Sequence, residues 1–110
     1  MNAFDKKIEM YHKIMKDLSI PCDIDKLIAC TLACGPSIYN PDGELVSSSD
    51  INELNTVKIR YLIQKLGLSN HEHLNEILDY AIEKFGKSNR RKYRAIFYYL
   101  CSQKANVFPL

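Results

Sequence analysis

The segment LNEILDYAIEKF, residues 74–85, carries the most regular hydrophobic pattern in this chain of 110 residues. Its apolar side chains recur every three or four positions, which places them on one face of an α-helix. They are Leu74, Ile77, Leu78, Ala81, Ile82 and Phe85. The stretch Ser69-Asn70-His71-Glu72 fits a capping box at the start of this helix, and Gly86 fits its end. The segment predicts an amphipathic helix in a mainly helical protein.

The preceding segment, residues 51–66, predicts another helix with a wide apolar face. Asp50 and Glu53 form a second capping box, in which Asp50 accepts a hydrogen bond from the first turn and Glu53 reaches back. Gly67 suits the left-handed conformation that commonly follows a helix end. These signals place the helix between Asp50 and Gly67.

Two helices are expected nearer the N-terminus. Apolar residues at helical spacing run over 4–18, and the pattern stops before Pro21, since a residue that precedes proline avoids the helical region. A shorter pattern runs over 23–33 and ends at Gly35-Pro36. The first half of the chain therefore contributes two helices.

A fifth helix is expected from Ser88 or Asn89 to about Lys104. Its inner face would carry Tyr93, Ile96, Phe97, Leu100 and Cys101. The tail over 106–110 is apolar, and we expect it to dock back onto the helices.

The segment 37–46 departs from helical periodicity and predicts a short β-hairpin. Asn40-Pro41-Asp42-Gly43 is a strong turn signal, because proline presets φ, aspartate bonds its own backbone and glycine accepts a positive φ. Apolar pairs, Ile38-Tyr39 and Leu45-Val46, lie on both sides. The exposed edges of such a hairpin could pair between two copies of the chain.

Together these patterns predict one mainly α domain over residues 1–110, with about five helices and one hairpin between the second and third. The sequence is 46% hydrophobic, which suffices for a core without disulfides or structural metal. No apolar run approaches the roughly 20 residues that a membrane-spanning helix needs. We therefore expect no membrane association.

Charge and cysteine content point to an ordinary cytoplasmic protein. Fifteen basic and thirteen acidic residues give a net charge of +2. The isoelectric point near 8.3 lies below the value of about 9 that is typical of nucleic-acid-binding domains. The N-terminus has no secretory signal pattern, so we expect a cytoplasmic location and reduced thiols.

An ordered series of short motifs resembles a known bacterial family. The most specific are Gly35-Pro36-Ser37-Ile38-Tyr39-Asn40 and Phe97-Tyr98-Tyr99-Leu100, with Lys65-Leu66-Gly67-Leu68 between them. The series is similar to the family catalogued as domain of unknown function 2853, over roughly residues 32–104. The resemblance implies a short, mostly helical, single-domain bacterial protein. It implies no activity and no functional residue.

The most suggestive cluster is the basic run over 87–94, with Lys87, Arg90, Arg91 and Arg94 as candidate anion-binding residues. If the fifth helix starts early, Lys87, Arg91, Arg94 and Tyr98 share one face and could hold phosphates. The alternative, which we favour about two to one, is pairing within the protein. The partners would be carboxylates of the helix over 74–85 and its first turn, namely Glu72, Glu76, Asp79 and Glu83.

The cysteines and histidines do not form a recognisable metal or catalytic motif. Cys30 and Cys34 lie one turn apart and His71 and His73 lie two positions apart, but zinc sites usually show two paired short spacings. We therefore expect buried cysteines, and no metal or other cofactor.

Cys22 is the one thiol worth testing for reactivity, because a nearby helix N-terminus could lower its pKa. Cys101 falls within an apolar face, a poor place for a nucleophile. Phosphate-binding loops and hydrolase motifs are also missing from the sequence. An enzyme is therefore the less favoured interpretation.

The tyrosines suggest an interaction surface. Tyr98 and Tyr99 lie 100° apart on a helix, so both cannot face inward, and an outward tyrosine is common at interfaces. We take Tyr39, Tyr98 and Tyr99 as candidate interface residues. The leading functional hypothesis is a non-enzymatic interaction module, and a homodimer is one form that it could take. The alternative is a weak nucleic-acid or phosphate-ligand binder that uses the run Lys87–Arg94.

Overall fold

The computed structural model describes residues 1–69 and 72–109 and confirms a mainly helical protein. Six α-helices are joined by a 3₁₀ segment, η1, and a π-helical segment, η2. The elements are α1 (Ala3–Asp17), α2 (Ile24–Cys34), η1 (Gly35–Tyr39), α3 (Pro41–Glu44), α4 (Ile51–Val57), η2 (Lys58–Lys65), α5 (Glu72–Phe85) and α6 (Arg94–Ala105). No helix in these described ranges is long and apolar enough to span a membrane.

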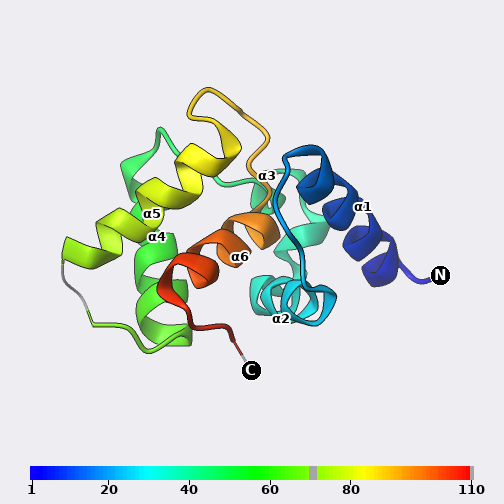
Figure 1. The fold of residues 1–110 in the computed structure, drawn as a ribbon, viewed down its shortest axis with the longest axis horizontal. Coiled ribbons are helices and arrows are strands. Elements are labelled where there is room, and N and C mark those ends of the chain that lie inside the picture. Colours follow the sequence, from blue (N-terminus) through cyan, green and yellow to red (C-terminus); the bar gives the residue numbers. More distant parts are fainter. Residues whose placement is uncertain (70–71, 110) are drawn as a thin grey trace.

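Helix α6 is the central element of the fold. It contacts α2 on one side and α5 on the other, with α1 beyond α2 and α4 beside α5 (Figure 1). Every residue from Ala95 to Ser102 is buried. This helix carries no charge between Arg94 and Lys104. A helix that is apolar on all sides is covered on all sides. The expectation that Tyr98 and Tyr99 cannot both face inward is therefore wrong, because both are buried.

The predicted helices over 4–18, 23–33 and 74–85 are confirmed within a residue or two. The capping box at Asp50 is confirmed in one half only. The Asp50 carboxylate accepts hydrogen bonds from the backbone N–H of Asn52 (2.9 Å) and Glu53 (3.4 Å), but the Glu53 carboxylate pairs with Arg94 instead of reaching back. The capping box predicted at 69–72 includes Asn70 and His71, which lie outside the described residues.

The predicted β-hairpin is wrong. Residues 37–46 contain no strand: the Asn40 side chain accepts hydrogen bonds from the N–H groups of Asp42 (2.9 Å) and Gly43 (3.4 Å) and so caps α3. An Asn-Pro pair suits a helix N-cap and first position as well as it suits a turn. Leu45 instead forms an isolated antiparallel bridge with Tyr93, far along the chain.

The helix expected over 51–66 is present but changes character at Lys58. Beyond that residue the hydrogen bonds span five residues, as from the N–H of Leu66 to the carbonyl of Tyr61 (2.9 Å). Such π-helical segments are rare in proteins, and those that do occur are often found at functional sites.

Helix α6 begins at Arg94, six residues later than expected from a start at Ser88. The Asn89 side chain holds the preceding segment as a loop, because its oxygen accepts from the N–H of Arg91 (2.8 Å) and its amide donates to the carbonyl of Phe85 (3.2 Å). Side-chain bonds of this kind compete with helix formation. The predicted basic face of Lys87, Arg91, Arg94 and Tyr98 therefore does not form.

The apolar tail docks as predicted, as far as it is described. The Phe108 ring packs edge-on against Tyr99, with 5.3 Å between ring centroids, and the Lys26 ammonium lies 4.8 Å from the Phe108 centroid. Asn106 adopts a left-handed conformation (φ 59°) that turns the chain back after α6. The tail thereby covers one edge of the core.

Candidate functional site

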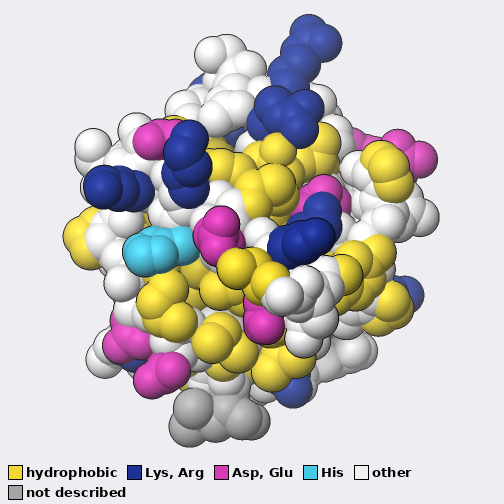
Figure 2. Space-filling model, turned by 90° about the vertical axis from the view of Figure 1, so that its right-hand side faces the viewer, with side chains coloured by type: hydrophobic (Ala, Val, Ile, Leu, Met, Phe, Trp, Pro, Cys, Tyr) yellow, Lys and Arg dark blue, Asp and Glu magenta, His cyan; other side chains and the backbone are white. Residues whose placement is uncertain are grey.

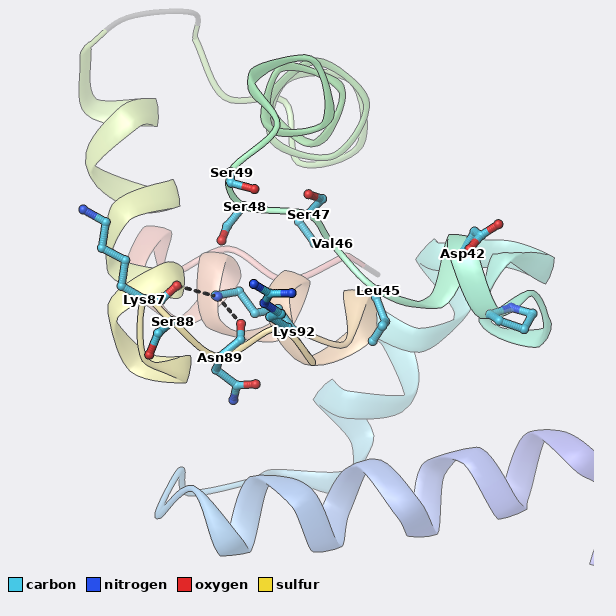
Figure 3. Close-up of a pocket in the computed structure, with 12 residues that line it drawn as sticks. Asp42, Leu45, Val46, Ser47, Ser48, Ser49, Lys87, Ser88, Asn89 and Lys92 are labelled. Atoms are coloured by element: carbon cyan, nitrogen blue, oxygen red, sulfur yellow. Dashed lines mark hydrogen bonds between the residues drawn. The ribbon is translucent and has the colours of Figure 1, made fainter.

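A polar cleft of about 660 Å³ lies between the segment 41–49 and the loop 87–92 (Figure 3). The two walls are held together where the Val46 N–H donates to the Lys92 carbonyl (2.8 Å), next to the bridge between Leu45 and Tyr93. The cleft therefore depends on the long-range pairing that replaces the predicted hairpin.

Lys92 is the most unusual residue of this cleft. Its side chain is buried, and the residue is only 2% exposed. The ammonium donates hydrogen bonds to the carbonyl oxygens of Lys87 (3.1 Å) and Asn89, drawn as dashed lines in Figure 3. It forms no ion pair with any carboxylate of the described residues. Burial lowers the pKa of Lys92, since it disfavours the charged form.

Two further cations lie at the edge of the cleft. Lys87 and Arg90 line it and are exposed, and within the described part of the chain neither makes an ion pair. Asp42 is the one carboxylate among the lining residues. Three basic groups against one acidic group make the cleft electropositive.

Serine hydroxyls complete the lining. Ser47, Ser48 and Ser49 come from one wall and Ser88 from the other. Figure 3 shows the Ser48 hydroxyl turned toward the loop that carries Lys92, while the Lys87 ammonium extends outward at the far edge. Hydroxyl and ammonium donors around one cleft are the groups that bind phosphate and carboxylate oxygens.

The other two predicted anion-binding residues lie elsewhere. Arg91 donates to the Tyr93 hydroxyl (2.7 and 3.2 Å) and lies over its ring. Arg94 pairs with Glu53 of α4 and donates to the carbonyls of Gly43 (2.7 Å) and Leu45 (3.3 Å). Arg94 therefore pairs within the protein, as the favoured alternative predicted. Its partner, however, lies on α4 and not on the helix that carries the expected carboxylates, which is α5.

The sequence did not single out Lys92 from its basic neighbours. Its burial follows from the pairing of residues 45–46 with 92–93, and nothing in the local pattern marks that pairing. The structure therefore brings together two predicted residues, Lys87 and Arg90, with one that was missed.

Of the three candidate interface tyrosines, only Tyr39 is exposed, at 52%. The Tyr98 ring stacks on Tyr61, with 3.8 Å between centroids, and the Tyr99 hydroxyl accepts from the N–H of Asp23 (2.9 Å). Tyr98 and Tyr99 are 7% and 4% exposed, so neither offers a free surface in the monomer.

The thiols are all free, and their surroundings disfavour the thiolate. Burial raises the pKa of Cys30 to about 11 and that of Cys34 to about 12. The pKa of Cys22 is also raised, by burial and by the neighbouring Asp23 carboxylate, which is opposite to the lowering that a helix N-terminus could cause. No group of three or more His, Cys, Asp or Glu side chains that could hold a metal is found in residues 1–69 and 72–109. His71 lies outside those ranges.

Comparison with known proteins adds a family but no activity. No curated protein matches the chain. The sequence profile of one family matches residues 9–107, which extends the resemblance seen over 32–104 to almost the whole chain and includes the four cysteines. The chain therefore belongs to the family described as protein of unknown function, DUF2853.

Proposed function

We propose that this protein binds a phosphate-bearing small molecule in the cleft between segments 41–49 and 87–92. The observation that carries the proposal is the buried ammonium of Lys92, which lacks a carboxylate partner among the described residues. Buried charges in proteins are normally paired, because removing a charge from water is costly. An anionic ligand in the cleft would supply the missing counter-charge.

The size and lining of the cleft favour a small ligand over a nucleic acid. A volume of about 660 Å³ lies within the range of roughly 300–1,000 Å³ that is usual for small-molecule pockets. Lys87 and Arg90 at the edge would contact phosphate oxygens, and the serine hydroxyls would donate further hydrogen bonds. The role that we propose for the cleft is ligand binding.

Calorimetric titration of the protein with pyrophosphate tests this proposal. We expect saturable binding that weakens as salt is added, and a loss of at least about tenfold in affinity for Lys87→Gln/Arg90→Gln, since two charge-assisted contacts disappear. The matched control is Lys6→Gln/Lys16→Gln, which removes two exposed charges from α1. Equal affinity of the two double variants would overturn the assignment of the cleft.

A nucleic acid is the alternative ligand for the same basic loop. Binding of a short single-stranded DNA, with no saturable response to pyrophosphate, would replace the small-molecule proposal by this alternative. Binding of pyrophosphate without DNA binding would support the cleft as a small-molecule site.

Self-association is a second candidate function. Leu32 and Tyr39, at the ends of α2 and η1, are 64% and 52% exposed. Hydrophobic side chains also spread between charged ones over the face on the side of α1 and α2 (Figure 2). We propose this face as the contact of a homodimer. Light scattering at increasing concentration tests it: a mass that stays at 12.7 kDa would count against a dimer.

We further propose that residues 1–110 form a single cytoplasmic domain. The one cluster of buried side chains shared by α1, α2, η2, α5 and α6 supports a single domain. Four free thiols support a reducing compartment.

A further inference from the structure

We propose that a second pocket binds the oxyanion of a small organic acid. This pocket is separate from the cleft between segments 41–49 and 87–92, which is called the anion-binding cleft below. This pocket, of about 390 Å³, lies where the C-terminal end of α2 meets α4, η2 and the start of α6. It shares no lining residue with the anion-binding cleft, so the inference does not rest on the function proposed above.

Two exposed cations line this pocket because η2 is a π-helix. Arg60 and Lys65 are five residues apart, and both contribute to the lining. In an α-helix such residues point to different sides, whereas hydrogen bonds that span five residues bring them near one face. Neither forms an ion pair within the described part of the chain. The rare helical form thus gathers two unpaired positive charges.

The acidic residue of the pocket is already neutralised. The Glu53 carboxylate pairs with Arg94, whose guanidinium is fixed by the carbonyls of Gly43 (2.7 Å) and Leu45 (3.3 Å). The side chains of Arg94 and Glu53 are 12% and 23% exposed, so this pair forms part of the wall. The charge that a ligand meets is therefore that of Arg60 and Lys65.

Tyr98 supplies a directed hydrogen-bond donor. Its ring is fixed by the stack on Tyr61, and its oxygen interacts with the Arg94 guanidinium. Burial raises the pKa of Tyr98, so the hydroxyl keeps its proton. Tyr98 lines the pocket, and no described residue accepts a hydrogen bond from its hydroxyl, so we infer that the hydroxyl donates to a ligand oxygen.

The remaining wall suits a short apolar body. Ala33 and the two stacked tyrosine rings line it together with Cys34, whose thiol donates to the Cys30 carbonyl (3.4 Å). Because burial holds the pKa of Cys34 at about 12, this thiol is neutral and does not repel an anion. A ligand with one anionic head and a small aromatic or aliphatic body fits these features.

Titrations of the full chain followed by backbone amide NMR spectra test the proposal. The probes are benzoate, phenyl phosphate and neutral benzamide. We expect saturable shifts around residues 33–34, 60–65 and 98 with an anionic probe, and no saturable response to benzamide. The stronger of benzoate and phenyl phosphate identifies the head group as a carboxylate or a phosphate. An equal response to benzamide would overturn recognition of an oxyanion.

Variants separate this pocket from the cleft. Arg60→Gln/Lys65→Gln should lower the affinity for the anionic probe by at least about tenfold. Tyr98→Phe, which keeps the ring stack, should lower it by about fivefold. Lys87→Gln/Arg90→Gln serves as the matched control, because it should change binding at the cleft alone and leave unchanged the affinity read from the shifts around residues 33–34, 60–65 and 98. If the control lowers affinity and Arg60→Gln/Lys65→Gln does not, the second pocket is refuted while the cleft stands. If no anionic probe gives saturable shifts, the second pocket is refuted whatever the cleft does.

Discussion

Replacing Arg94 by methionine should destabilise the protein more than most single substitutions. The guanidinium joins three elements, because it contacts Glu53 on α4 and the carbonyls of Gly43 on α3 and Leu45 beyond it. Methionine keeps much of the aliphatic length but none of these contacts. The Glu53 carboxylate, 23% exposed, would lose its counter-charge.

The size of the effect follows from the contacts that are lost. Each hydrogen bond to a charged group contributes about 1.5–3 kcal/mol, but desolvation of the guanidinium offsets part of the sum. Breaking a buried pair by removing one partner costs about 3–5 kcal/mol, and the partial exposure of this pair places the expected loss near the lower end. We expect the free energy of unfolding to fall by about 3 kcal/mol. With a urea dependence of about 1–3 kcal/mol per molar, the midpoint should fall by at least about 1 M.

A double-mutant cycle completes this test. Urea unfolding is followed by circular dichroism for the wild type, Arg94→Met, Glu53→Gln and the double variant. If the pair matters as described, the double variant is more stable than the sum of the single losses predicts, by about 1–3 kcal/mol. Arg94→Lys, which retains the charge but loses the planar fork, should fall between wild type and Arg94→Met. A loss below about 0.5 kcal/mol for Arg94→Met, or strictly additive losses, would refute the reasoning.

Three further predictions concern local features. Asn40→Ala removes the cap of α3 and should lower the free energy of unfolding by about 1 kcal/mol, whereas Asn55→Ala on the exposed face of α4 should change it by less than about 0.5 kcal/mol in the same urea titration. Tyr61→Phe leaves the buried Ser102 hydroxyl without its 2.6 Å partner and should cost about 1–3 kcal/mol; a thermal melt equal to that of wild type would contradict it. The free energy of unfolding should fall above about pH 9. The reason is that the unfolded chain releases its thiol protons near the ordinary pKa of 9.0, whereas the pKa of Cys30 in the folded protein is about 11. Urea midpoints that stay constant from pH 8 to pH 11 would disprove this.

The helices could be predicted because their signals are local. The apolar spacing over 74–85 and the cap at Asp50 act within one or two turns, so no distant residue is needed to interpret them. Helix α5 accordingly begins and ends close to the expected positions. The family resemblance was likewise carried by short contiguous motifs.

The errors arose where one local pattern fits two structures. Asn40-Pro41 suits either a hairpin turn or a helix cap, and the choice depends on whether Leu45 pairs with the preceding strand or with Tyr93. The same pairing ends the loop before Arg94 and so shifts the start of α6. On an isolated helix Tyr98 would lie off the apolar face. In the folded protein α2, η2 and α5 surround α6, and the ring of Tyr98 is buried against Tyr61 of η2.

The candidate sites depend still more on distant contacts. Lys87 and Arg90 were identified from the sequence because charge is a local property. The burial of Lys92 requires the 41–49 segment to cross the loop, and the grouping of Arg60, Lys65 and Tyr98 requires a π-helix to pack beside α6. Neither arrangement can be recognised from the spacing of apolar residues in the sequence.

Local side-chain chemistry was thus enough to establish a helical protein, most of its helix ends and one basic segment. Long-range packing alone decided which tyrosines are covered, which lysine is buried and where the two polar pockets lie. The physical reason is that helix spacing and capping act over a few residues, whereas burial and charge pairing depend on segments that meet only after the chain has folded.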